Sequence, residues 1–167
     1  MNRTRRAVTF LATLALLAAQ AAAPLAGVAA AKQQESETDK LARLLSASGY
    51  TTTRMNERAW FIAREGKAFS RSPILVGVFE GTMVIGVVLA KKAEMPANAE
   101  FYRKLLDMNH AFSRAKVGFD NDSDAFVRVE LSLRVTDVEE LQFNIREVIN
   151  STEQAYTQIE GDLRAQP

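Results

Sequence analysis

The stretch "PILVGVFEGTMVIGVVLA", residues 73–90, decides the fold. It holds two apolar, β-branched runs, Ile74 to Phe79 and Met83 to Leu89, separated by Glu80-Gly81-Thr82. Glycine in a short break between two such runs is typical of a tight β-hairpin, so we predict a turn at these three residues. Neither run alternates with polar residues, which indicates two central strands with both sheet faces covered.

The side chains of this hairpin divide into two sets because successive strand residues point to opposite faces. The predicted sets are Val76, Val78, Val84 and Val88 on one side and Leu75, Phe79, Ile85 and Leu89 on the other. Only one set can pack against helices, and the other would form an apolar patch that soluble monomers generally avoid. We therefore expect a second copy of the chain to cover the outward set, with Val84 or Ile85 at the contact.

Helical periodicity flanks the strands. Ser36 and Asp39 resemble a capping box and Gly49 stands where helices often end, which predicts a helix over 38–48. A second helix is expected to start at Pro96 and Asn98. A third, long helix opens with the capping pattern "TDVE", residues 136–139, and its apolar residues recur every three or four positions as far as 159.

Four further strands complete the predicted fold, at residues 50–55, 59–64, 114–120 and 125–135. The last two alternate cleanly, with apolar residues on one face and polar residues on the other. These elements predict an α+β domain over residues 38–163, in which a largely antiparallel sheet has its helices packed on one face.

The stretch "FDNDSDAF", residues 119–126, spaces Asp120, Asp122 and Asp124 like the first ligands of a calcium-binding loop. Such a loop also needs glycine at its sixth position and a bidentate glutamate at its twelfth, where this chain has Ala125 and Leu131. Aspartate and asparagine favour turns, because their side chains bond nearby backbone N–H groups. We therefore interpret the stretch as the tip of a hairpin and predict no metal site.

The sequence offers no catalytic or cofactor-binding constellation. His110 is the only histidine, cysteine is absent, and there is no glycine-rich phosphate loop and no G-x-S-x-G motif. Nucleophilic catalysis needs a positioned base and an oxyanion hole, and zinc needs several nitrogen or sulfur ligands. We expect a protein that is not an enzyme and that carries no cofactor.

Basic residues gather on the two alternating strands. We take Arg114, Lys116, Arg128 and Arg134 as candidates for contact with an anionic partner. Glu130 falls in the middle of this set, so a solvated sheet face is the alternative interpretation.

The N-terminus predicts export. Three arginines in the first six residues precede an apolar run and a zone of small residues, which is the pattern of a secretory signal peptide over 1–31, followed by a polar linker over 32–37. The alternative is an uncleaved membrane anchor, because the apolar segment is long enough to span a bilayer. Cleavage would leave a periplasmic or secreted protein without membrane insertion.

Loss of the leader changes the charge. It removes three arginines from 21 basic residues and none of the 20 acidic ones, which leaves 18 against 20 and a net charge of −2. A near-neutral domain gives no electrostatic case for nucleic acid. With no cysteine there are no disulfides, so stability must come from a hydrophobic core.

The stretch "LLDMNHAFSRAKVGFDNDSDAFVRVELSLRVTDVEELQFNIREVINSTEQAY", residues 105–156, resembles the second half of YbjN-type domains, also called bacterial sensory transduction regulators. The shared features are a helix ending in "LL..N", a strand like "KVGFD", an acidic turn, a strand like "FVRVEL.LR" and a C-terminal helix. With the central hairpin included, the resemblance extends over residues 38–156.

The resemblance implies a type III secretion chaperone-like α/β sandwich that dimerises and binds an extended segment of a client protein. It transfers no catalytic residues. We therefore expect an exported, homodimeric protein-binding module with an unidentified protein client. The alternative is a carrier that holds a small ligand or lipid on an apolar sheet face.

Overall fold

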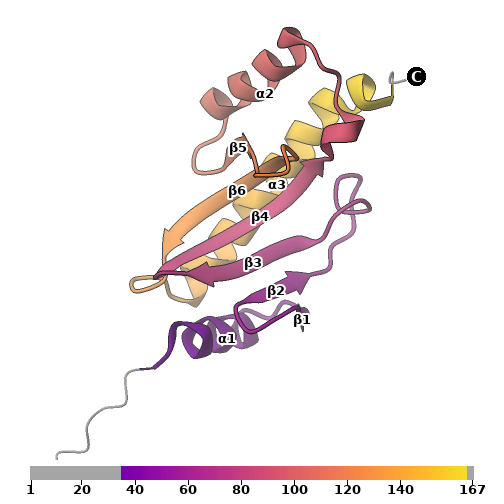
Figure 1. Ribbon diagram of the computed structural model, residues 1–167. Coiled ribbons are helices and arrows are strands. Elements are labelled where there is room, and N and C mark those ends of the chain that lie inside the picture. Colours follow the sequence, from indigo (N-terminus) through magenta and orange to yellow (C-terminus); the bar gives the residue numbers. More distant parts are fainter. Residues whose placement is uncertain (1–34, 165–167) are drawn as a thin grey trace, which may run out of the picture. The chain divides into compact units, whose positions relative to one another are not determined.

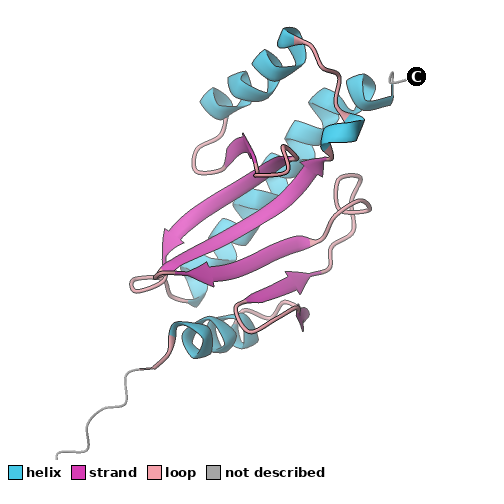
Figure 2. Cartoon of the chain, viewed as in Figure 1, coloured by secondary structure: helices cyan, strands magenta, loops and turns pink. Residues whose placement is uncertain are grey.

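The computed structural model describes residues 35–164 of the chain (Figure 1, Figure 2). The predicted leader, residues 1–31, lies outside the described residues. The helices of this range are α1 (Glu37–Ala47), the 3-10 turn η1 (Lys92–Glu94), α2 (Ala99–Ala111) and α3 (Val138–Arg164). The strands are β1 (Thr52–Arg54), β2 (Ala59–Ile62), β3 (Ile74–Phe79), β4 (Thr82–Ala90), β5 (Lys116–Phe119) and β6 (Ala125–Ser132).

The strands form one antiparallel sheet in the order β1-β2-β3-β4-β6-β5. Figure 1 shows α3 running behind β4 and β6, and α3 contacts both strands. Helix α1 packs near β3 and α3, and α2 packs against β5 and α3. The predicted α+β architecture with helices on one face of an antiparallel sheet is confirmed.

The core lies between the sheet and α3. Strand residues that point toward the helices are almost completely buried, among them Ile74, Val76, Met83, Ile85, Val127 and Val129. From α3, Leu141, Ile145, Val148 and Ile159 meet them, each without exposed surface. Burying a large aliphatic side chain stabilises the fold by about 1.5–3 kcal/mol, so this layer supplies most of the stability of a chain that has no disulfide.

The central hairpin has a two-residue turn, not the predicted three-residue turn. Glu80 and Gly81 both have positive φ, at 46° and 77°, and Phe79 pairs directly with Thr82. Positive φ at both central residues is the geometry of a type I′ hairpin turn, whose twist matches that of the strands.

The shorter turn changes which side chains share a face. A register shift of one residue turns every side chain of one strand to the opposite face. The observed inward set is Val76, Val78, Ile85 and Leu89, and the outward set is Leu75, Phe79, Val84 and Val88. The predicted grouping was therefore wrong for β4, and Ile85, which is fully buried under the helices, cannot be the contact residue.

Both ends of α1 are capped by the residues that the sequence predicts. The Ser36 hydroxyl accepts a hydrogen bond from the Asp39 N–H, and Gly49 adopts a φ of 78° just beyond α1. The predicted cap of α3 needs a correction. The carboxylate of Asp137, not the hydroxyl of Thr136, accepts from the Glu140 N–H, while Thr136 Oγ1 donates to the Ser132 carbonyl at 2.8 Å.

Residues 120–124 form the predicted hairpin tip. Strands β5 and β6 pair antiparallel on either side of it, and Asp120 Oδ1 accepts from the N–H groups of Asp122 and Asp124. Ser123 takes a φ of 65°. No group of three or more potential metal ligands occurs within residues 35–164. None of the helices in that range is both long and apolar enough to cross a membrane.

Candidate functional site

The candidate site is the sheet face turned away from α3, which we call the open face. Figure 1 shows that none of the described helices lies over this face of β3, β4 and β6. Two of its apolar side chains are prominent, since Phe79 is 61% exposed and Leu75 is 39% exposed. Val84 and Val88 beside them are partly exposed. The open face is therefore an apolar surface that the described part of the chain leaves uncovered.

Side chains on the open face lie in rows that cross the strands. The Val84 row contains Ala59, Gly77, Val84 and Glu130, each paired with the next across neighbouring strands. The Gly86 row contains Phe61, Leu75, Gly86, Arg128 and Lys116 in the same way. Both rows mix large side chains with glycine, so the face is ridged and not flat.

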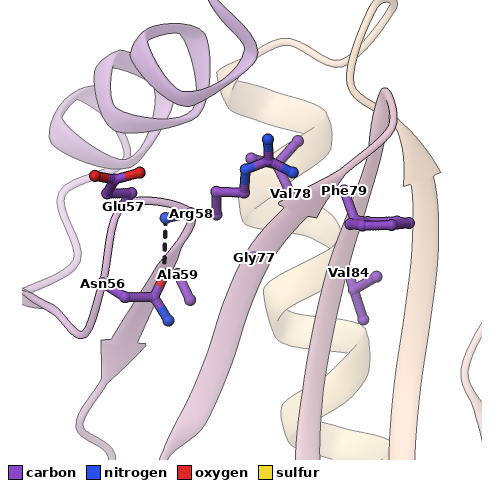
Figure 3. Close-up of a pocket in the computed structure, with 8 residues that line it drawn as sticks. All are labelled: Asn56, Glu57, Arg58, Ala59, Gly77, Val78, Phe79 and Val84. Carbon is purple, nitrogen blue, oxygen red and sulfur yellow. Dashed lines mark hydrogen bonds between the residues drawn. The ribbon is translucent and has the colours of Figure 1, made fainter.

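Ala59 and Gly77 of the Val84 row lie at the floor of a hollow of about 560 Å³ (Figure 3). Phe79 and Val84 border it on one side, and the turn between β1 and β2 borders it on the other. That turn is held by a hydrogen bond from the Arg58 N–H to Asn56 Oδ1 at 2.8 Å. Gly77 and Ala59 keep the floor low because they carry little or no side chain.

A second hollow, of about 340 Å³, surrounds Gly86. Its walls are mainly apolar and include Phe61, Leu75 and Phe126, with Arg128 at the rim. A Cβ at Gly86 would lie 3.0 Å from the Arg128 Cβ and 3.1 Å from the Val127 carbonyl oxygen, so a larger residue would crowd β6 and fill the notch. Val84 lines both hollows, so they adjoin on the open face, and we call the two together the groove.

The basic residues do not form the strip that the sequence suggests. Lys116 and Arg128 are cross-strand neighbours on the open face. Arg114 precedes β5 and belongs to the helical side, where it pairs with Glu140 and lies 4.8 Å over the Phe143 ring. Arg134 follows the end of β6.

Arg128 is already engaged within the chain. Its guanidinium lies 2.7 Å from Glu130 and 4.5 Å over the Phe126 ring. Arg128 and Glu130 therefore neutralise each other on the open face, and an anionic partner would have to compete with Glu130 for Arg128. This ion pair is compatible with the alternative interpretation, a solvated sheet face.

One edge of the sheet is closed by a side chain of α2. Asn109 Oδ1 accepts from the Val117 N–H at 2.7 Å, and Asn109 Nδ2 donates to the Val117 carbonyl at 3.2 Å. The asparagine thus takes the place that another strand would occupy beside β5. Unpaired edges are templates for pairing with other chains, and this contact blocks one of them.

The other edge, β1, has no partner strand within the described residues. The Met55 N–H donates to the Ala59 carbonyl at 2.9 Å, which fixes the alternation of this antiparallel pair. In this alternation the backbone of Thr53 forms hydrogen bonds with the backbone of Phe61. The backbone N–H and C=O groups of Thr52 and Arg54 therefore point away from β2, toward the open edge. The sequence reasoning did not identify this edge, although the polar composition of the first predicted strand is typical of one.

The architecture, a six-stranded antiparallel sheet with helices on one face, is an α+β sandwich that resembles type III secretion chaperones in fold. No family model matches the sequence, and no curated protein sequence matches it. Solved structures do. YbjN from E. coli is similar with a TM-score of 0.57 and 14% identity, over 74% of this chain and 90% of that chain.

Two secretion complexes give similar values. The heterodimeric ExoU–SpcU complex from the type III secretion system of Pseudomonas aeruginosa matches at TM-score 0.52 and 16% identity, over 74% of this chain and 98% of that chain. The Yersinia pestis type III secretion chaperone SycH, in complex with a fragment of YscM2, matches at 0.51 and 12%, over 72% and 99%. The chain therefore has a YbjN-like, type III secretion chaperone-like fold.

Proposed function

We propose that this chain is an exported, homodimeric, non-enzymatic protein-binding module that holds an extended segment of a client protein along the free edge of β1. The observation that carries the proposal is the asymmetry of the two sheet edges. The edge of β5 is closed by Asn109, whereas Thr52 and Arg54 direct backbone groups outward from β1. Addition of a strand to an open edge uses such groups for affinity.

The fold neighbours support a protein client. SpcU with ExoU and SycH with a YscM2 fragment are named as complexes of two proteins. The HopA1–SchA structure is named as a chaperone–effector complex. A chain with this fold and one open strand edge is suited to binding another protein.

Export is supported by the leader pattern of residues 1–31. We expect the protein in the envelope or medium to begin near Lys32. Mass spectrometry of the native protein should then find no peptide from the first two dozen residues. Recovery of peptides from Met1 to Arg6 in a membrane fraction would show a retained anchor and contradict the proposed cleavage.

The client proposal can be tested with a library of linear peptides displayed on phage and selected on the purified protein. Thr52→Pro removes one outward N–H group, and we expect it to weaken the selected peptides at least tenfold, about 1.4 kcal/mol. Thr52→Val keeps the N–H and serves as the matched control. Selected peptides should alternate between two side-chain classes, because alternate residues of a strand face the same side.

Peptides that bind Thr52→Pro as tightly as the wild type, with its melting temperature unchanged, would contradict this site. The apolar hollow around Gly86 favours one alternative function, a carrier of a small apolar ligand. Native mass spectrometry of protein purified from its producing cells would then detect a bound small molecule, and loss of that molecule in Val84→Lys would place it in the groove.

A further inference from the structure

The open face is complementary to itself. On β3 and β4, each cross-strand pair of this face joins one large and one small residue: Leu75 with Gly86, Val84 with Gly77, and Phe79 with Thr82. The large members alternate between the two strands along the hairpin. A ridge on one strand therefore lies beside a notch on the other in every row.

We propose that a second copy of the chain packs face to face on this surface, about a two-fold axis that runs along the strands between β3 and β4. Such an axis places β3 of one copy opposite β4 of the partner, and each row of side chains opposite the same row of the partner. Leu75 then enters the notch at the partner's Gly86, and Val84 lies over the partner's Gly77. Two sheets packed in this way are separated by about 10 Å, with their side chains interlocked.

The flanking strands fit the same operation. The axis places Phe61 of β2 opposite the partner's Arg128, since both belong to the Gly86 row at equal distances from the axis. A guanidinium over an aromatic face is a favourable contact. The Arg128–Glu130 ion pair remains intact within each copy, so no unpaired charge is buried.

The expected affinity of the dimer follows from the area of the interface. The four strands that carry these rows, β2, β3, β4 and β6, lie about 4.8 Å apart and give a footprint of roughly 20 Å by 20 Å, or about 400 Å² per copy. The pair would bury about 800 Å², the size of a weak, transient interface, so we expect a dissociation constant in the micromolar range.

We favour a second copy over a client on this face because the face is complementary, in both shape and charge, to the same face of a second copy. This inference rests on the proposed homodimer and assigns its surface. The β1 edge stays outside the contact in both copies, because β1 is an outer strand of the sheet and the axis places it at the margin of the dimer, on the side of the partner's β5.

Sedimentation equilibrium of the purified protein tests the proposal. We expect a monomer–dimer equilibrium for the wild type and a dissociation constant raised at least about 100-fold in Val84→Lys, which would bury an unpaired ammonium. Gly77→Val fits the monomer, where the nearest atom to a new Cβ is the Arg58 carbonyl oxygen at 3.4 Å, but it collides with the partner's Val84. The double variant Gly77→Val/Val84→Ala should recover the dimer.

Leu106→Lys is the matched control, because Leu106 is 59% exposed on α2, away from the open face. A dimer lost in Leu106→Lys but kept in Val84→Lys would overturn this interface while leaving the homodimer itself in place. A wild type that stays monomeric throughout the micromolar range would overturn both. Melting curves of each variant show whether the fold is retained, and the compensating double variant distinguishes a contact from a loss of folding.

Discussion

Asp124 ends the turn between β5 and β6 with its side chain nearly buried. Its Oδ2 lies 2.6 Å from Lys91 Nζ, and its Oδ1 accepts from the Lys92 N–H at 2.8 Å. The hydrogen bond from Lys91 and then that from the Lys92 N–H hold the pKa of the Asp124 carboxyl below its ordinary value of 3.8. The third aspartate of the acidic turn thus ties the hairpin tip to the end of β4.

This pKa shift predicts how stability depends on pH. A carboxyl whose pKa is lowered by folding stabilises the native state above its unfolded pKa, and this stabilisation is lost as the pH falls through the folded pKa. We therefore expect Asp124→Asn to lower the urea midpoint of unfolding at pH 7 and to have little effect at pH 2. Asp122→Asn, at an exposed aspartate of the same turn, is the control. An equal deficit of Asp124→Asn at both pH values would contradict the role of the charge.

At the scale of elements, the positions of helices and strands could be predicted from the sequence because they depend on local patterns. Periodicity places α1, α2 and α3, and the apolar runs place β3 and β4. The face that each strand of the hairpin presents could not be predicted, because it depends on whether Thr82 belongs to the turn or to the strand. That single residue decides that Val84 faces outward and Ile85 inward.

The position of Arg114 could not be predicted for a similar reason. Arg114 continues the alternation of the strand in sequence, but the chain between α2 and β5 turns it toward α3, where Glu140 and Phe143 engage it. Strand boundaries depend on tertiary contacts that periodicity does not contain. Lys116 and Arg128, inside the observed strands, do share the predicted face.

The hairpin turn yields a prediction of its own. Glu80 has a φ of 46°, a left-handed conformation that costs most residues about 1–2 kcal/mol and that asparagine tolerates better. Glu80→Asn creates the Asn-Gly pair preferred in type I′ turns. We expect it to raise the free energy of unfolding by about 0.5–1 kcal/mol, measured in urea. Glu80→Ala keeps the strain and should give no gain, and equal stability of the two variants would argue against the two-residue turn.

The closure of β5 by Asn109 can be tested separately. Asn109→Ala leaves the Val117 N–H and C=O without their partner, which should cost about 1–3 kcal/mol of stability and expose a strand edge. We expect faster aggregation on mild heating, followed by light scattering. Leu106→Ala, on an exposed position of the same helix, is the control. Asn109→Ala that melts and scatters like the wild type would show that the edge is protected by other means.

At the scale of the whole molecule, we propose different tasks for the two surfaces. In this proposal the open face binds the second copy, and the β1 edge binds the client. The two-fold axis lies between β3 and β4 near the middle of the sheet, so the two β1 edges of the dimer fall on opposite margins, each over the partner's β5. The dimer would then carry two equivalent client sites that do not touch.

This arrangement predicts the stoichiometry of binding. A peptide selected on the wild type should bind with one site per chain and without cooperativity in isothermal titration calorimetry, because neither site contacts the other. Val84→Lys should dissociate the dimer yet bind the same peptide within about twofold of the wild-type affinity, since the Thr52 and Arg54 backbone groups are unchanged. Thr52→Pro should show the reverse, with dimerisation kept and peptide affinity lost. One peptide per dimer, or loss of peptide binding in Val84→Lys with the fold intact, would mean that the client lies across both copies and that the open face and the β1 edge form a single site.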